Sequence, residues 1–135
     1  MRIYCDTCLY IDIFEGRKDR FRDLAEFALQ IFRRVREGEF TLIVSDWLLF
    51  ELSRHADDKT ITDFLKPLFD KGKVIKVFKT PEDIKQAKII SPGHYHDALH
   101  AILANKAEAV YLLTRNIEHY AGCEHLVEIK FPENI

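Results

Sequence analysis

The stretch Arg2 to Asp6, with the sequence RIYCD, is a short apolar run that ends in an acid. Such a run is typical of a buried β-strand. Similar apolar runs follow at residues 41–45, 74–78, 109–114 and 126–131. Their hydrophobicity is nearly continuous rather than alternating, which is typical of parallel strands buried on both faces. The sequence therefore predicts five strands in a parallel sheet.

Helical patterns separate the predicted strands. Apolar residues recur at helical spacing over residues 19–37 and 94–106, and further helices are expected at 8–14, 61–71 and 117–121. Asp46 is expected to cap a helix that carries Glu51, and Thr80 followed by Pro81 marks another helix start. The alternation of strands and helices predicts an α/β fold with helices on both faces of the sheet.

Length and composition fit one globular domain over residues 1–135, with 47% hydrophobic and 31% charged residues. The net charge of −2 gives no general attraction to nucleic acid, so RNA binding would need a local patch or a bound cation. We see no signal peptide and no apolar run of membrane-spanning length, so a cytoplasmic protein without a membrane partner is expected. Cys5 and Cys8 form a CxxC without the second half of a zinc site, which favours buried packing for both.

Oxygen-bearing side chains stand where the predicted strands and helices meet. Asp6 ends the first strand, Glu51 lies early in the helix after the second, and Asn116 follows the fourth. Asp97 lies in the first turns of the helix before that fourth strand. Ligands of such sheets bind outside the carboxyl ends of the strands. Gathered carboxylates repel unless a cation neutralises them, and oxygen ligands suit Mg²⁺ or Mn²⁺. The pattern thus predicts metal-assisted phosphodiester hydrolysis.

Three segments resemble the motifs of PIN domains, and the similarity covers nearly the whole chain in the right order. Residues 3–7 resemble the opening strand with its Asp-Thr end, and residues 94–104, HYHDALHAILA, resemble the third motif. Residues 112–116, LLTRN, are similar to the fourth motif, and Glu51 matches the second acid. The resemblance implies a three-layer α/β/α fold with strand order 3-2-1-4-5. It also implies a Mg²⁺- or Mn²⁺-dependent endoribonuclease, the toxin of a toxin–antitoxin pair of the VapC kind, and a homodimer.

The fourth motif departs from the commoner pattern, because Asn116 stands where most members carry Asp. Asn supplies an oxygen but no charge, which puts a tightly held second metal in doubt. Glu118 is a candidate for the missing charge, and Thr7 and Thr114 are candidate supporting residues. Thr114 either ends its strand or makes an orienting hydrogen bond to a metal-bound water or to Asp6. Arg115 is the cation expected to contact substrate phosphate.

Other polar residues have two interpretations each. His94, His96 and His100 are expected to have surface or substrate-contact roles, since the metalloprotease pattern is missing. The cations of the first third are expected to form a solvated face or to contact RNA; they are Arg17, Lys18, Arg20, Arg22, Arg33, Arg34 and Arg36. Phe21, Phe27 and Phe32 indicate a dimer surface or, alternatively, core packing.

Parts of this pattern also occur in proteins with other functions. The alternative from the same fold is a catalytically weak or inactive module that binds RNA or protein, which Asn116 favours. Phospho-acceptor receivers and dehalogenase-type phosphatases also place an acid after the first strand. A dehalogenase-type enzyme needs Asp-x-Asp, and Cys8 occupies the third position of that motif here. A receiver would need a paired acid before Asp6, which the sequence lacks.

Overall fold

The computed structural model describes residues 1–16 and 23–135. Within them a five-stranded sheet has the order β3-β2-β1-β4-β5, and every neighbouring pair is parallel. The strands are β1 (Arg2–Cys5), β2 (Thr41–Ser45), β3 (Val74–Val77), β4 (Tyr111–Leu113) and β5 (Glu128–Lys130). The parallel sheet and its order are confirmed, although β4 and β5 are shorter than the apolar runs that predicted them.

Six α-helices connect these strands in the described part of the chain. They are α1 (Thr7–Glu15), α2 (Leu24–Arg36), α3 (Asp46–Leu52), α4 (Asp58–Asp70), α5 (Pro81–Ile90) and α6 (Tyr95–Lys106). Short 3₁₀ turns follow at Ile117–Tyr120 and Pro132–Asn134. The predicted start of the second helix at Asp19 lies outside the described residues, as do Arg17, Lys18, Arg20, Phe21 and Arg22.

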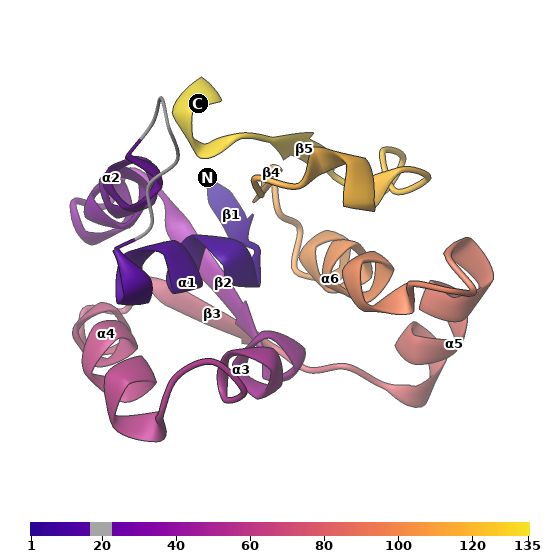
Figure 1. Cartoon of the computed structure of the whole chain (residues 1–135), viewed down its shortest axis with the longest axis horizontal. Helices are drawn as coiled ribbons and strands as arrows, with labels where there is room; N and C mark the ends of the chain where they lie inside the picture. The colour runs from indigo at the N-terminus through magenta and orange to yellow at the C-terminus, as the bar shows by residue number, and fades with distance from the viewer. Residues whose placement is uncertain (17–22) are drawn as a thin grey trace.

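The sheet lies between two helical layers because successive side chains of a strand point to opposite faces. Ile3 and Cys5 of β1 pack into the core beneath α1, α2 and α4. Tyr4, between them, packs into a second core beneath α5 and α6. Figure 1 shows this arrangement, with α1, α2 and α4 on one side of the strands and α5 and α6 on the other. The three-layer α/β/α architecture is therefore confirmed.

Helix caps fix how the chain leaves each strand at the rim of the sheet. Asp6 caps α1 by accepting a hydrogen bond from the Thr7 N–H (2.7 Å). The cap of α3 is Ser45, whose hydroxyl accepts from Leu48 N–H (2.9 Å). The prediction that Asp46 is this cap was wrong by one residue, because Asp46 lies inside the first turn and receives the Lys79 ammonium (3.3 Å).

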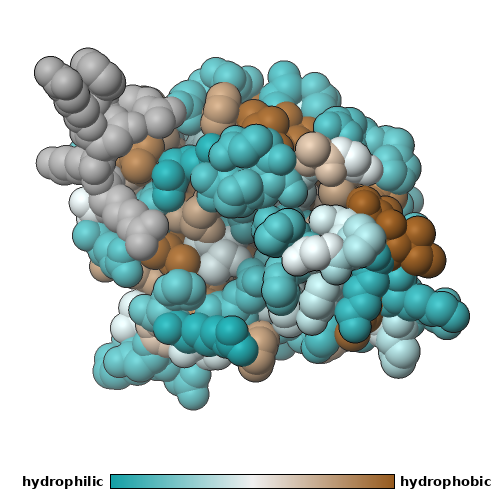
Figure 2. Space-filling model, turned by 45° about the vertical axis from the view of Figure 1, so that its right-hand side comes forward, coloured by the Kyte–Doolittle hydropathy of each residue, from teal (hydrophilic) through white to brown (hydrophobic). Residues whose placement is uncertain are grey.

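The exposure of the large hydrophobic side chains can be compared with the predicted homodimer. Phe32 is only 5% exposed and belongs to the core, so it cannot form a dimer surface. The exposed large hydrophobic side chains of the described residues are Met1, Leu29, Phe50, Phe78, Ile89 and Val110. On the face shown in Figure 2, hydrophobic patches are separated by hydrophilic surface. The homodimer thus stays a prediction. Among the described residues, no helix is long and apolar enough to cross a membrane.

Candidate active site

A pocket of about 480 Å³ opens at the carboxyl ends of the central strands. All four residues predicted as ligands line it: Asp6, Glu51, Asp97 and Asn116. They come from the end of β1, from α3, from the first turn of α6 and from the segment after β4. The remaining lining residues are Thr7, Cys8, Ile11, Arg54, His55, Arg115 and His119. The fold thus brings residues that are distant in sequence to one cavity.

Asp6 is held rigidly at the floor of this pocket. Its side chain is only 6% exposed, and one carboxylate oxygen caps α1 through the Thr7 N–H. The other oxygen accepts a hydrogen bond from the Thr114 hydroxyl (2.8 Å). That hydroxyl also accepts from the Asn116 N–H (3.0 Å), so the fourth motif is tied to the first. The predicted orienting hydrogen bond from Thr114 to Asp6 is present.

Glu51 approaches Asp6 from α3 and shares its neighbours. The Thr7 hydroxyl donates to Glu51 Oε1 (2.9 Å), and the same oxygen lies 2.5 Å from Nε2 of His100. Burial by itself would raise the pKa of Glu51, but the hydrogen bond and charge of His100 hold that pKa below its ordinary value. Glu51 is therefore an ionised carboxylate whose orientation is fixed on two sides.

His100 was expected to have a surface or substrate-contact role, and this was wrong, because its side chain is fully buried. Its Nδ1 lies 2.6 Å from the Tyr4 hydroxyl, which in turn lies 2.6 Å from the hydroxyl of Ser45. Burial disfavours the charged imidazole, yet the hydrogen bond to Glu51 and the charges of Asp6 and Glu51 raise the pKa of His100 overall. The buried chain Ser45–Tyr4–His100–Glu51 therefore supports the pocket from below. His94 and His96 are exposed, as expected for surface residues.

Asp97 faces the same carboxylates from α6. Burial raises the pKa of Asp97, and the negative charge of Asp6 raises it further. His119 partly offsets this, with its Nδ1 3.6 Å from Asp97 Oδ2. Burial and the neighbouring carboxylates therefore both disfavour the ionised form of Asp97.

The cations of the pocket differ in part from those predicted. Arg115 lines it, but its guanidinium donates two hydrogen bonds to Asp12 (2.5 and 2.7 Å). Arg54 and His55 were not singled out from the sequence; they lie in the turn that follows the end of α3 at Leu52. Glu118 is exposed and lines an adjoining pocket with Asp97 and His119.

The donor set of the pocket fits a hydrated divalent cation better than a tightly caged one. Three carboxylates and one amide oxygen are hard ligands, of the type that Mg²⁺ and Mn²⁺ accept. Within residues 1–16 and 23–135, however, no group of three His, Cys, Asp or Glu side chains is placed to hold an ion by itself. Mg²⁺ commonly keeps several waters and is bound through only one or two carboxylates, so it does not need such a group. Asp6, Glu51, Asp97 and Asn116 would hold such an ion, in part through water.

Comparison with known proteins identifies the fold. No family model matches the sequence, and no curated protein matches it. A chain of FitAB bound to the IR36 DNA fragment matches with a TM-score of 0.61 and 15% identity, over 98% of this chain and 96% of that one. A chain of VapBC2 from Rickettsia felis, bound to a promoter DNA fragment, matches with a TM-score of 0.61 and 14% identity, over 97% and 98%. The PIN-like fold that the resemblance implied is therefore confirmed at the level of the fold.

Proposed function

From this shared fold and the acidic pocket, we propose that the chain is a metal-dependent endoribonuclease. The observation that carries the proposal is that Asp6, Glu51, Asp97 and Asn116 line one pocket at the carboxyl ends of the strands. We assign these four residues as the ligands of Mg²⁺ or Mn²⁺. Carboxylates that repel one another at such a place are typical of a site completed by a cation.

The residues of the pocket have separable tasks in hydrolysis. When bound, the ion would neutralise the charge that develops on the phosphate and help to activate water. Thr114 and Thr7 hold Asp6 and Glu51 in fixed orientations. Arg54 and His55 stand where they can contact the phosphates beside the scissile bond. Arg115, fixed by Asp12, adds positive charge at the pocket wall.

We further propose that the enzyme is the toxin of a toxin–antitoxin pair that acts on cytoplasmic RNA. The support is the fold shared with chains of FitAB and VapBC2, both seen as complexes on DNA. An antitoxin protein is the partner that this proposal requires. Where a small reading frame adjoins the gene, co-expression of its product with this chain, followed by copurification, would identify the partner.

The test of catalysis is a cleavage assay on single-stranded RNA with Mg²⁺ or Mn²⁺, comparing wild type with Asp6→Asn and Asp97→Asn. Each substitution removes a ligand charge while nearly keeping its shape, so cleavage should fall by at least about a hundredfold. Asp63→Asn, on the exposed side of α4, is the matched control and should cleave like wild type. Cleavage that persists unchanged in both pocket variants would point to a contaminating nuclease and sink the assignment.

The second candidate is a binding module that kept the fold and lost catalysis, and Asn116 is the observation that favours it. In that case no RNA is cleaved with either metal, and calorimetry shows weak metal binding. Asn116→Asp then restores the missing charge and should tighten metal binding. If wild type binds metal tightly and cleaves RNA, the binding-module interpretation is wrong.

A further inference from the structure

A row of stacked rings runs along the surface beside the pocket. Trp47 stacks with Phe50 (ring centroids 5.7 Å apart, 22° between planes) and with His96 (5.7 Å, 7°). His96 stacks in turn with Tyr95 (4.4 Å, 28°). The Trp47 indole N–H donates to the carbonyl of His96 (3.2 Å), which fixes α3 against α6. We call Phe50, Trp47, His96 and Tyr95 the aromatic row.

The four rings of the aromatic row differ in their solvent exposure, so the inner ring can be distinguished from the outer rings. Trp47 is only 8% exposed and forms the inner member, whereas Phe50 is 49% exposed. His96 is also exposed and Tyr95 is half-buried. Burial of a ring as large as Phe50 would be favourable, and about half of that gain is still available to a ligand that covers it. The outer rings thus offer apolar faces to a ligand.

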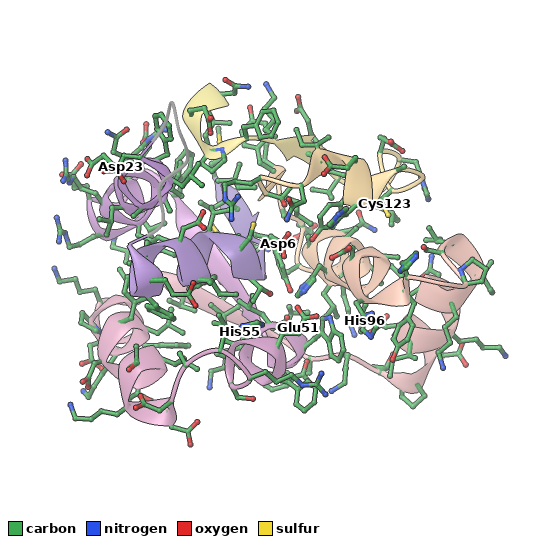
Figure 3. All side chains as sticks on the ribbon, in the orientation of Figure 1. Asp6, Asp23, Glu51, His55, His96 and Cys123 are labelled. Atoms are coloured by element: carbon green, nitrogen blue, oxygen red, sulfur yellow. The ribbon has the colours of Figure 1, made fainter. Side chains whose placement is uncertain are left out.

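Two members of the aromatic row are sequence neighbours of candidate catalytic residues, although the four rings do not line the pocket themselves. Phe50 directly precedes Glu51 on α3, and His96 directly precedes Asp97 on α6. In Figure 3, Glu51 of α3 and His96 of α6 lie near each other, below Asp6 in this view. Arg54 lines the pocket and also covers Phe50, so a polymer that places one phosphate in the pocket can extend its neighbouring units toward these rings.

Cations cover the two ends of the aromatic row. The Arg54 guanidinium lies over Phe50 (4.9 Å), and the Lys88 ammonium lies over Tyr95 (5.1 Å). Arg54 also lines the pocket, and no carboxylate of the described residues forms a salt bridge with it. Both side chains are exposed and flexible, so each can turn from the ring to a phosphate.

We propose that the aromatic row is a stacking platform for the bases of single-stranded RNA next to the phosphate in the pocket. Bases stack on the outer rings, and Arg54 and Lys88 turn to the backbone phosphates. The rings provide stacking surfaces for bases, and the neighbouring cations provide partners for phosphates. This combination favours a nucleic-acid strand over a protein as the occupant. The platform rests on the proposed function for its substrate, yet it makes a binding prediction that needs no cleavage.

The experiment measures binding of labelled oligoadenylate RNA by fluorescence anisotropy in EDTA, where metal-dependent cleavage cannot occur. The comparison ligand is an abasic ribose-phosphate oligomer of the same length, which keeps the charge and lacks the bases. Because the chain has one tryptophan, Trp47 fluorescence reports directly on the row. Oligoadenylate should bind more tightly than the abasic oligomer and should quench Trp47.

Variants at one position separate stacking from general hydrophobic contact. Phe50→Leu keeps an apolar side chain without a ring and should weaken oligoadenylate binding by about five- to hundredfold. Phe50→Tyr keeps the ring and should bind like wild type. Phe78→Leu removes another exposed ring, one that stacks on no described residue, and should leave binding unchanged.

Two outcomes would overturn the platform. If the abasic oligomer bound as tightly as oligoadenylate, the bases would not contact the platform. If Phe50→Leu bound oligoadenylate as tightly as wild type, the aromatic row would not be an RNA-binding surface, and a protein would be its more suitable ligand. The failure of the proposed function looks different. Oligoadenylate binding that depends on Phe50, without RNA cleavage in Mg²⁺ or Mn²⁺, would keep the platform and reject the nuclease. RNA cleavage in Mg²⁺ or Mn²⁺, together with RNA binding that does not depend on Phe50, would keep the nuclease and reject the platform.

Discussion

His100 ties three elements together beneath the candidate site, because its ring contacts Tyr4 of β1 and Glu51 of α3 from its own position on α6. Both ring nitrogens have partners at 2.6 Å or less, and the side chain is fully buried. His100 pairs with an ionised Glu51 whose other contact is the Thr7 hydroxyl. We regard His100 as a positioning residue, since it acts on the pocket through Glu51.

His100→Phe should lower the free energy of unfolding by about 2 to 3 kcal/mol, because it removes hydrogen bonds to the buried Tyr4 hydroxyl and to the half-buried Glu51 carboxylate. It should also raise the Mg²⁺ concentration needed for half-maximal metal binding, since Glu51 loses its fixed orientation. Urea unfolding measures the first effect and calorimetric titration the second. His100→Gln retains a hydrogen-bonding group and should recover part of both. A variant with unchanged metal affinity would show that Glu51 does not depend on His100.

Helix α5 is joined to α6 through Asp83, which takes part in two local structures. Its carboxylate accepts from the Thr80 N–H (2.9 Å) while the Thr80 hydroxyl accepts from the Asp83 N–H (3.2 Å), a reciprocal capping box. The same oxygen receives the Lys106 ammonium at the end of α6 (3.0 Å). Burial would raise the pKa of Asp83, but these hydrogen bonds hold it below the ordinary value of 3.8.

Asp83→Asn should therefore destabilise the chain by about 1 kcal/mol near neutral pH, as expected for a partly exposed cap and ion pair. A carboxylate whose pKa is lowered by folding stabilises above its ordinary pKa. That stabilisation disappears as the pH falls through the lowered pKa. The difference in the free energy of unfolding between wild type and variant should therefore vanish as the pH falls below 3.8. Urea unfolding at a series of pH values checks this. A gap that persists in acid would assign the effect to shape rather than charge.

The elements were predictable from sequence where the signal is local, and less so where it depends on tertiary contacts. Continuous apolar runs correctly predicted β1 and β2, and Thr80-Pro81 correctly predicted the start of α5. These predictions succeeded because hydrophobic periodicity and helix caps are local properties of the sequence. Ser45 and Asp46 are both good caps, and the path of the chain after β2 selects Ser45. The burial of His100 depends on Tyr4 and Glu51, which are remote in sequence, so no local pattern indicates it.

The whole molecule places like charges together at one end of the sheet. Asp6, Glu51 and Asp97 come from β1, α3 and α6, so folding itself creates their repulsion. Their convergence on one pocket follows from parallel topology, in which the carboxyl ends of strands share an edge. The sequence could predict that shared edge through motif order. It could not predict Arg54, His55 and His119 around it, because their placement depends on how α3 and the segment after β4 turn.

Asp97→Asn should make the metal-free protein more stable. Burial and the charge of Asp6 raise the pKa of Asp97, so its ionised form costs folding free energy at neutral pH, and Asn removes that cost. Each kcal/mol gained would raise the melting midpoint of a domain of this size by about 3 to 5 °C. Calorimetric or optical melting in EDTA measures the change. Asp63→Asn, which removes an exposed charge paired with Lys59, should give no rise.

The same melts with excess Mn²⁺ test whether the pocket is a metal site. An ion that binds the folded state alone stabilises it, by about 2.7 kcal/mol at a hundredfold excess over Kd. Wild type should therefore melt later with Mn²⁺ than in EDTA, and Asp97→Asn should lose most of that increase. The order of stability would then invert: the variant melts later in EDTA, and wild type melts later with metal. If Mn²⁺ raised both proteins equally, the ion would bind elsewhere, and Asp97 would not be a ligand.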